Sequence, residues 1–209
     1  IVSVPFDSGS GEKGRGCSGA PDLIRDYLER ESSWAKPENG SDVFRSWKKI
    51  NTVLHAVLPF WEEAESLLLK ADYDLIVGGD NSVSVPGFRS FLKQCGGPVM
   101  LFHADAHPDC RDPNMQPRPD PHASWVRRLI VEGSLCPQHY FLFCSRVNDW
   151  RGDAAGSEYD YLRRLEIYNH IYSMTRLENE GICMRNDLDF AALFRSLFIA
   201  DPRLTKEIK

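Results

Sequence analysis

Short apolar runs alternate with amphipathic stretches along most of this chain. The runs expected to be strands or extended segments are Ile1–Pro5, Tyr73–Val77, Pro98–His103, Tyr140–Cys144 and Ile167–Ile171. The stretches expected to be helical are Asp22–Arg30, Val43–Ala71, Ser82–Gln94, Ala123–Glu132 and Tyr159–Leu165. Such alternation indicates βαβ units and a mostly parallel sheet. We therefore predict a single α/β domain over residues 1–209, with three αβα layers.

Two prolines mark helix boundaries in this pattern. Pro21 stands beside the acidic residue Asp22, and both residue types suit the first turn of a helix. Pro59 falls inside the longest helical stretch, where its missing N–H is expected to break or kink the helix.

Polar, acidic segments follow three of the apparent strands. Asp105, His107 and Asp109 come directly after the apolar run 98–102, and in an extended backbone their i, i+2, i+4 spacing points them to one side. The segments 78–81 and 187–189 hold comparable positions. Sites in parallel sheets gather at the carboxyl ends of the strands, so we expect the three segments to build one site.

Four carboxylates and one imidazole at one place indicate a metal site. Asp105, Asp109, Asp187 and Asp189 would repel one another without a cation, and together with His107 they exceed the ligands of one ion that keeps an open position. They suit two ions bridged by shared carboxylates, an arrangement that activates a hydroxide. Carboxylate-rich ligation without thiolates favours Mn²⁺ or Mg²⁺ over zinc.

Composition narrows the class of protein. The chain has 25 Lys and Arg against 30 Asp and Glu, so its net charge of −5 gives no footprint for nucleic acid or an anionic membrane. No apolar run approaches the roughly 20 residues that cross a bilayer. Six cysteines without a C-x-x-C pair are typical of a reducing compartment. We expect a cytoplasmic protein, and the first residue, Ile1 rather than methionine, leaves organelle targeting open.

Several motifs, in this order, resemble those of the ureohydrolases, the family of arginase, agmatinase and formiminoglutamase. The segments are 4–9 with 19–25, the Gly-Gly-Asp-Asn-Ser of 78–82, the Asp-Ala-His-Pro-Asp of 105–109, the His-Ala-Ser-Trp-Val-Arg of 122–127 and the Asp-Leu-Asp of 187–189. The resemblance implies an arginase-like fold and Mn²⁺-dependent hydrolysis of a linear amidine or guanidine C–N bond by a metal-bridging hydroxide. It also implies a small guanidino or formimino substrate and a homo-oligomer, a trimer or hexamer.

The same resemblance implies roles for the metal ligands. Asp105 and Asp187 would bridge two Mn²⁺ ions, Asp109 would help hold the first ion, and His107 and Asp189 would help hold the second.

Three further positions are assigned by the resemblance. His122 stands where the family has a proton-shuttling histidine, and imidazole titrates near neutral pH. Arg111 stands where formiminoglutamases have an arginine suited to bidentate pairing with a substrate carboxylate. Asn81 replaces the histidine that ligates the first metal, so we expect this first site to bind its ion weakly.

Plainer readings remain open for single residues. His122 and Asn81 also suit helix caps, and Arg111 also suits a solvent-facing loop. His103 is expected to be a buried strand residue or a partner of a ligand rather than a ligand itself.

The chain departs from the family in ways that support a second function. Besides Asn81, Ala192 stands where the family has a third late aspartate, and the family's C-terminal portion is expected to be lacking beyond Lys209. The alternative function is therefore a catalytically silent relative with a regulatory or structural binding role.

Overall fold

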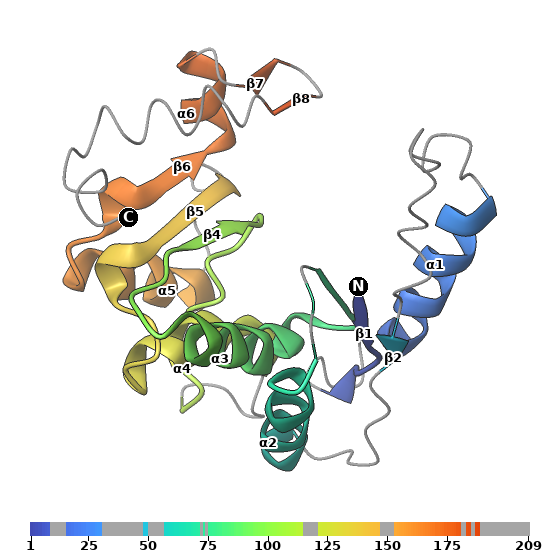
Figure 1. The fold of residues 1–209 in the computed structure, drawn as a ribbon. Helices are drawn as coiled ribbons and strands as arrows, with labels where there is room; N and C mark the ends of the chain where they lie inside the picture. The colour runs from blue at the N-terminus through green and yellow to red at the C-terminus, as the bar shows by residue number, and fades with distance from the viewer. Residues whose placement is uncertain are drawn as a thin grey trace.

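The computed structural model describes two parallel sheets with helices packed against them (Figure 1). It describes residues 1–8, 16–30, 48–49, 57–71, 73, 75–114, 121–146, 153–180, 183–184 and 187–188. One sheet has the strand order β2-β1-β3 and the other the order β4-β5-β6. All pairings within these two sheets are parallel, which confirms the predicted α/β class with a mostly parallel sheet.

The strands are short and close to their predicted places. The first sheet contains β1 (Val2–Val4), β2 (Lys48–Lys49) and β3 (Ile76–Gly78). The second contains β4 (Leu101–Ala104), β5 (Tyr140–Ser145) and β6 (Ile171–Ser173). Two further strands, β7 (Cys183–Met184) and β8 (Asp187–Leu188), form an antiparallel pair.

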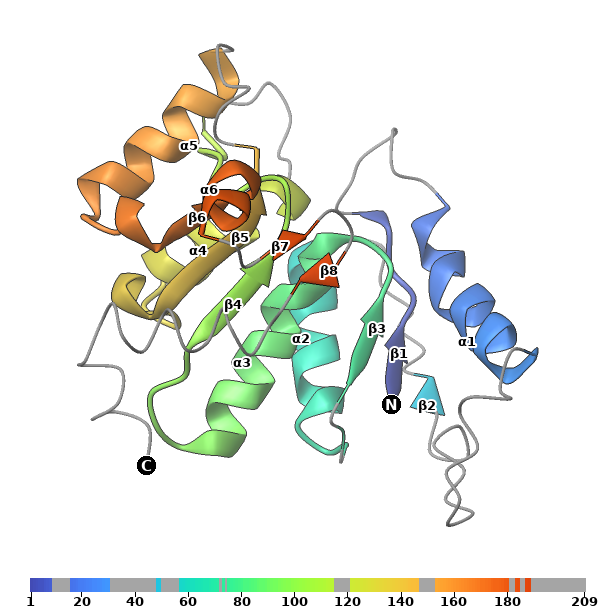
Figure 2. The same ribbon diagram turned by 90° about the horizontal axis from the view of Figure 1, so that it is seen from above.

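Six α-helices accompany the strands in the described residues. They are α1 (Ala20–Arg30), α2 (Val57–Leu68), α3 (Ser84–Cys95), α4 (Trp125–Val131), α5 (Asp153–Arg164) and α6 (Met174–Asn179). Short 3-10 helices are η2 (Cys17–Gly19), η4 (Asn81–Val83), η5 (Pro121–Ala123), η6 (Pro137–His139) and η8 (Tyr168–His170). Figures 1 and 2 show α2 and α3 side by side, and they show α3 and α4 on one side of the β4-β5-β6 sheet with α6 on the other.

Local sequence explains most of these boundaries. Pro21 is the second residue of α1 and Pro59 the third of α2, and in a first turn a proline's missing N–H leaves no hydrogen bond unmade. Pro59 therefore lies in the first turn of α2, where it need not kink the helix. Helix α3 ends at Gly96, whose φ of 62° is the left-handed conformation that glycine adopts at low cost.

Two sequence predictions are wrong. The helix predicted over 43–71 does not include Lys48 and Lys49, which pair in parallel with Val2 and Ser3 as strand β2. The remainder of that stretch before residue 57 lies outside the described residues. The extended segment predicted over 167–171 is mostly the 3-10 helix η8, and the strand begins only at Ile171.

An apolar core holds the helices against the sheets. Its largest fully buried side chains are Tyr140, Phe60, Phe141, Leu68, Leu129, Leu135, Leu142, Leu162, Ile167 and Leu177. Strand β5 is buried at five of its six positions, as expected for the central strand of three with helices on both sides. Strand β5 pairs in parallel with β4, and the carboxyl end of β4 leads into the acidic segment 105–109.

Candidate metal centre

The carboxyl end of β4 delivers two carboxylates to one point. Asp105 extends the pairing with β5 by one residue, since its N–H donates to the Phe143 carbonyl at 3.1 Å. The chain then bends, and Asp105 Oδ1 accepts a hydrogen bond of 2.9 Å from the N–H of His107. Asp109 has a left-handed φ of 49°, an uncommon conformation for a residue with a Cβ and one that concentrates at functional sites.

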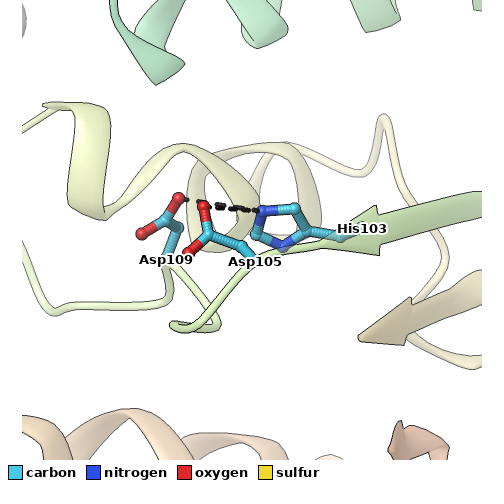
Figure 3. Close-up of side chains that lie close together, drawn as sticks. All are labelled: His103, Asp105 and Asp109. Atoms are coloured by element: carbon cyan, nitrogen blue, oxygen red, sulfur yellow. Dashed lines mark ion pairs between the residues drawn. The ribbon is translucent and has the colours of Figure 1, made fainter. Parts of the chain in front are cut away.

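A histidine from within β4 completes this cluster (Figure 3). His103, Asp105 and Asp109 each offer one donor atom within 4.8 Å of the others. The His103 Nε2 atom lies 3.7 Å from Asp105 Oδ2 and 3.9 Å from Asp109 Oδ2. The predicted convergence of residues 105 and 109 is therefore present, and the imidazole between them comes from position 103.

His107 takes a more peripheral place than the strand spacing predicted. Strand β4 ends at Ala104, so the alternation of faces does not continue through residue 107. Its Nδ1 atom lies 3.6 Å from Asp105 Oδ1, and 58% of its side chain is exposed. The resemblance implies that His107 helps hold the second ion, and this role stays a prediction.

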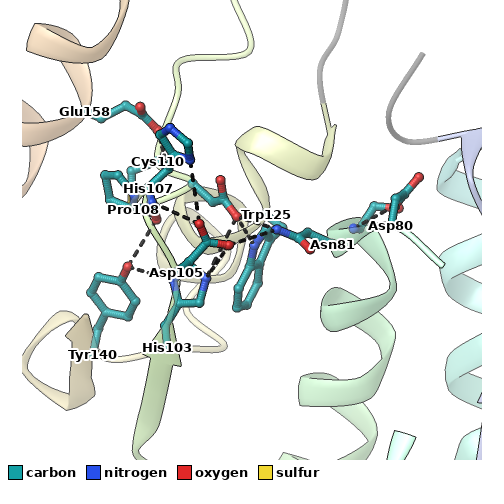
Figure 4. A network of polar contacts seen from close by, with 12 residues as sticks. Asp80, Asn81, His103, Asp105, His107, Pro108, Cys110, Trp125, Tyr140 and Glu158 are labelled. Carbon is teal, nitrogen blue, oxygen red and sulfur yellow. Dashed lines mark hydrogen bonds and ion pairs between the residues drawn. The ribbon is translucent and has the colours of Figure 1, made fainter. Parts of the chain in front are cut away.

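Asn81 faces Asp105 from the segment that follows β3 (Figure 4). Its Nδ2 atom donates to Asp109 Oδ2 at 3.0 Å and to Asp105 Oδ2 at 3.3 Å. The cap of η4 is Asp80, whose Oδ1 accepts from the N–H of Ser82 at 2.8 Å, so the reading of Asn81 as a helix cap is wrong. The amide N–H₂ takes the position that a cation would share with the two carboxylates.

The backbone before Asn81 requires glycine. A Cβ atom on Gly79 would lie 1.9 Å from the Phe6 carbonyl oxygen, far inside any real contact. The Asp80 N–H donates to that same oxygen at 2.9 Å. Close approach of this turn to the loop after β1 is what sets Asn81 opposite the end of β4.

Asp109 is more deeply buried than Asp105. It is 5% exposed, and Trp125 Nε1 on α4 donates to its Oδ2 at 2.7 Å. Burial raises the pKa of Asp109, against the lowering effects of His103, Asn81 and Trp125.

A small cavity beside the carboxylates gathers most of the predicted site. It has a volume of about 180 Å³, and its walls include six of the predicted residues, Asn81, Asp105, His107, Asp109, Arg111 and His122. The side chain of Asp187, in β8, and the whole of Asp189 lie outside the described residues, and their part in the site stays a prediction.

One residue of this cavity was missed by the sequence reasoning. Glu158 on α5 lines the cavity, is 1% exposed, and accepts a hydrogen bond of 2.9 Å from the N–H of Cys110 through Oε1. Its Oε2 has no hydrogen-bond partner among the described residues and lies 3.9 Å from Arg111 Nε. Burial raises the pKa of Glu158 to about 7. Nothing in its helical segment signals this contact, which spans 48 residues of sequence.

These donors fit a divalent cation. Two carboxylates, an imidazole and an amide surround one point, and oxygen-rich ligation with imidazole suits Mn²⁺. A half-turn of the Asn81 amide would present its oxygen, a neutral ligand, in place of its nitrogen.

No helix in the described part of the chain combines the length and the apolar character needed to cross a membrane.

Solved structures similar to this chain share its fold. A formimidoylglutamase from Bacillus subtilis superposes with a TM-score of 0.71 and 18% identity, covering 95% of this chain and 59% of that one. A Trypanosoma cruzi formiminoglutamase solved with Mn²⁺ gives a TM-score of 0.69 and 21% identity, covering 95% and 64%. A proclavaminate amidino hydrolase from Streptomyces clavuligerus gives a TM-score of 0.66 and 23% identity, covering 93% and 63%. The predicted three-layer, arginase-like fold is thus confirmed, and the chain spans about six tenths of these proteins.

Sequence comparison gives local matches to plant arginases. Arginase 2 of Arabidopsis thaliana is 41% identical over 59 residues, which is 28% of this chain and 17% of the relative. The arginase of Glycine max is 42% identical over 59 residues, with the same coverage. The family model described as the arginase family matches residues 1–192. With nearly its whole length matched by this model, the chain belongs to the arginase family.

Proposed function

We propose that this chain provides the active site of a Mn²⁺-dependent hydrolase that cleaves a C–N bond of a linear amidine or guanidine carrying a carboxylate. The observation that carries the proposal is the cavity of about 180 Å³ in which Asp105 and Asp109 face Arg111 and His122. Membership of the arginase family supports the reaction class. The substrate class rests on Arg111.

The acidic residues would hold the metal. Asp105 and Asp187 would bind both ions, Asp109 would help hold the first, and His107 and Asp189 would help hold the second. When bound, such ions lower the pKa of water far below its bulk value and so supply a nucleophile at neutral pH. His122, on the cavity wall, would pass a proton to the leaving amine.

Arg111 would select the substrate. Its guanidinium is a bidentate partner for a carboxylate, and its Nε lies 3.9 Å from the buried Glu158 Oε2. Glu158 lies beside the Arg111 side chain, and the Arg111 backbone N–H donates to the Ala123 carbonyl at 3.0 Å, which holds the Arg111 backbone at the cavity. Formiminoglutamate and arginine carry a carboxylate, whereas agmatine carries none.

A substrate panel tests this proposal. The purified chain is assayed with formiminoglutamate, arginine and agmatine, with and without Mn²⁺, by release of formamide or urea. We expect turnover only with Mn²⁺ and a preference for the carboxylated substrates. Arg111→Met should raise KM for these substrates by roughly 10- to 150-fold, the equivalent of one charge-assisted hydrogen bond, and leave agmatine unaffected. Arg163→Met, on the exposed side of α5, is the control. An equal loss on agmatine would contradict the role of Arg111.

One observation favours a catalytically silent relative as the second candidate. The Asn81 amide donates to both Asp105 and Asp109, so a single neutral side chain joins the two carboxylates where the family has a metal ligand. If the wild-type chain shows no turnover at saturating Mn²⁺ and Asn81→His acquires it, the weak first metal site alone accounts for the silence. If neither protein turns over any substrate of the panel, the silent relative is supported and the hydrolase proposal fails.

A further inference from the structure

The His103 imidazole lies too far from the two carboxylates to hydrogen-bond with either, but at a spacing that suits a shared ion. Its Nε2 atom is 3.7 Å from Asp105 Oδ2 and 3.9 Å from Asp109 Oδ2, beyond the roughly 2.7–3.2 Å of a hydrogen bond. Donors that share one ion at about 2.1 Å lie roughly 3–4 Å apart. The three atoms therefore stand at the spacing of ligands around a common ion.

Tyr140 fixes which nitrogen of His103 faces the carboxylates. The Tyr140 hydroxyl donates its one hydrogen to the Pro108 carbonyl at 3.1 Å. It lies 3.1 Å from His103 Nδ1, where it can then only accept, so Nδ1 carries a hydrogen. In the neutral imidazole the Nε2 lone pair is left directed at Asp105 and Asp109. Metal-bound histidines commonly donate their second ring N–H to such a fixed partner.

A bare lone pair between two carboxylates is unfavourable unless a cation lies there. Trp125 holds the ring in this orientation by an edge contact, with ring centroids 5.0 Å apart and planes at 75°. His103 is 9% exposed, so water compensates little for the repulsion. The one alternative that removes it, a proton on Nε2, competes directly with a metal ion for the same lone pair.

We propose that His103 binds the first metal ion through Nε2, together with Asp105 and Asp109, and supplies the imidazole that Asn81 does not. This inference rests on the proposed metal-dependent function for its ion, but not on turnover. It changes the first site from one that has lost its histidine to one that takes its histidine from inside β4.

Metal binding itself tests the proposal. Isothermal titration with Mn²⁺ is carried out on the wild-type chain, His103→Ala and His103→Gln, the last keeping the side chain's volume in case the first does not fold. Each protein is checked by circular dichroism. We expect both variants to lose affinity for Mn²⁺ by about 100-fold or more. Tyr140→Phe should lose about 10- to 100-fold, because without the hydroxyl nothing keeps the imidazole hydrogen on Nδ1.

His170→Gln is the matched control. His170 is a second buried histidine, stacked on Phe141 with centroids 4.5 Å apart and bonded through Nδ1 to the Tyr140 carbonyl. It should leave Mn²⁺ affinity unchanged. Pulsed EPR of the first bound Mn²⁺ should show ¹⁴N coupling from an imidazole in the wild-type chain and in His107→Gln, and no such coupling in His103→Gln.

Three results are decisive. Affinity and ¹⁴N coupling that persist in both His103 variants overturn the ligand assignment while leaving a metal site and the proposed function intact. Normal Mn²⁺ binding through His103 without turnover of any substrate supports the ligand and contradicts the proposed hydrolase. Absence of Mn²⁺ binding by the wild-type chain overturns both.

Discussion

Replacing Glu158 by glutamine should make the stability of this protein less sensitive to alkaline pH. The carboxylate is 1% exposed, accepts one hydrogen bond from the Cys110 N–H, and leaves Oε2 without a hydrogen-bond partner in the described residues. Burial raises its pKa from 4.5 to about 7. Glutamine keeps an oxygen for the Cys110 N–H and removes the need to bury a charge.

The size of the effect follows from this pKa. In the folded state Glu158 retains its proton up to about pH 7, whereas the unfolded chain releases it near pH 4.5, so stability falls as the pH rises through this window. At 1.36 kcal/mol per unit, ionising Glu158 costs about 3 kcal/mol at pH 8 and about 1 kcal/mol at pH 5. The glutamine variant should lack this difference, about 2.5 kcal/mol between the two pH values.

Urea unfolding in the presence of a chelator measures this difference. The free energy of unfolding is determined for the wild-type chain and Glu158→Gln at pH 5 and pH 8, with Glu178→Gln on the exposed side of α6 as the control for loss of one negative charge. We expect the free energy of unfolding of Glu158→Gln to rise relative to that of the wild-type chain as the pH rises. Parallel pH profiles for the two proteins would refute the reasoning, because they would mean that Glu158 is ionised at no unusual cost.

Two further substitutions test how the site is supported. Gly79→Ala places a Cβ atom 1.9 Å from the Phe6 carbonyl oxygen and should cost at least about 2 kcal/mol of unfolding free energy, whereas Gly97→Ala, with open space around it, should stay within about 0.5 kcal/mol; equal effects would mean that the close approach is not needed. Trp125→Phe removes the 2.7 Å hydrogen bond to the buried Asp109 and should cost about 1.5–3 kcal/mol near pH 7, with a further rise in the pKa of Asp109. Retained stability near pH 7 would show that other donors satisfy this carboxylate.

Local patterns predicted the fold well wherever chain neighbours decide the structure. Apolar runs located β1, β4 and β5, and the helical period located α3 and α4 within a few residues. The prediction for Lys48 and Lys49 was wrong because these residues form a strand by pairing with β1. No helical or alternating pattern in their own segment indicates that pairing.

The site residues likewise fall into those that local sequence predicts and those that depend on distant contacts. Asp105, Asp109 and Asn81 were found from their positions after strands, since parallel topology brings such ends together. His103 lay on the correct face by its spacing from Asp105, but its tautomer depends on Tyr140, 37 residues away. Glu158 had no local signal, because its partner Cys110 belongs to another element.

The place that Asn81 takes between the two carboxylates has a consequence for how fast the site exchanges its ion. Asn81 is exposed, and exposed side chains change rotamer within picoseconds to nanoseconds. An arriving cation therefore displaces two hydrogen bonds without waiting for any slow rearrangement. In the proposed site, Asn81 should therefore leave the rate at which Mn²⁺ enters unchanged, and any loss of affinity relative to a histidine at position 81 should appear as a shorter lifetime of the bound ion.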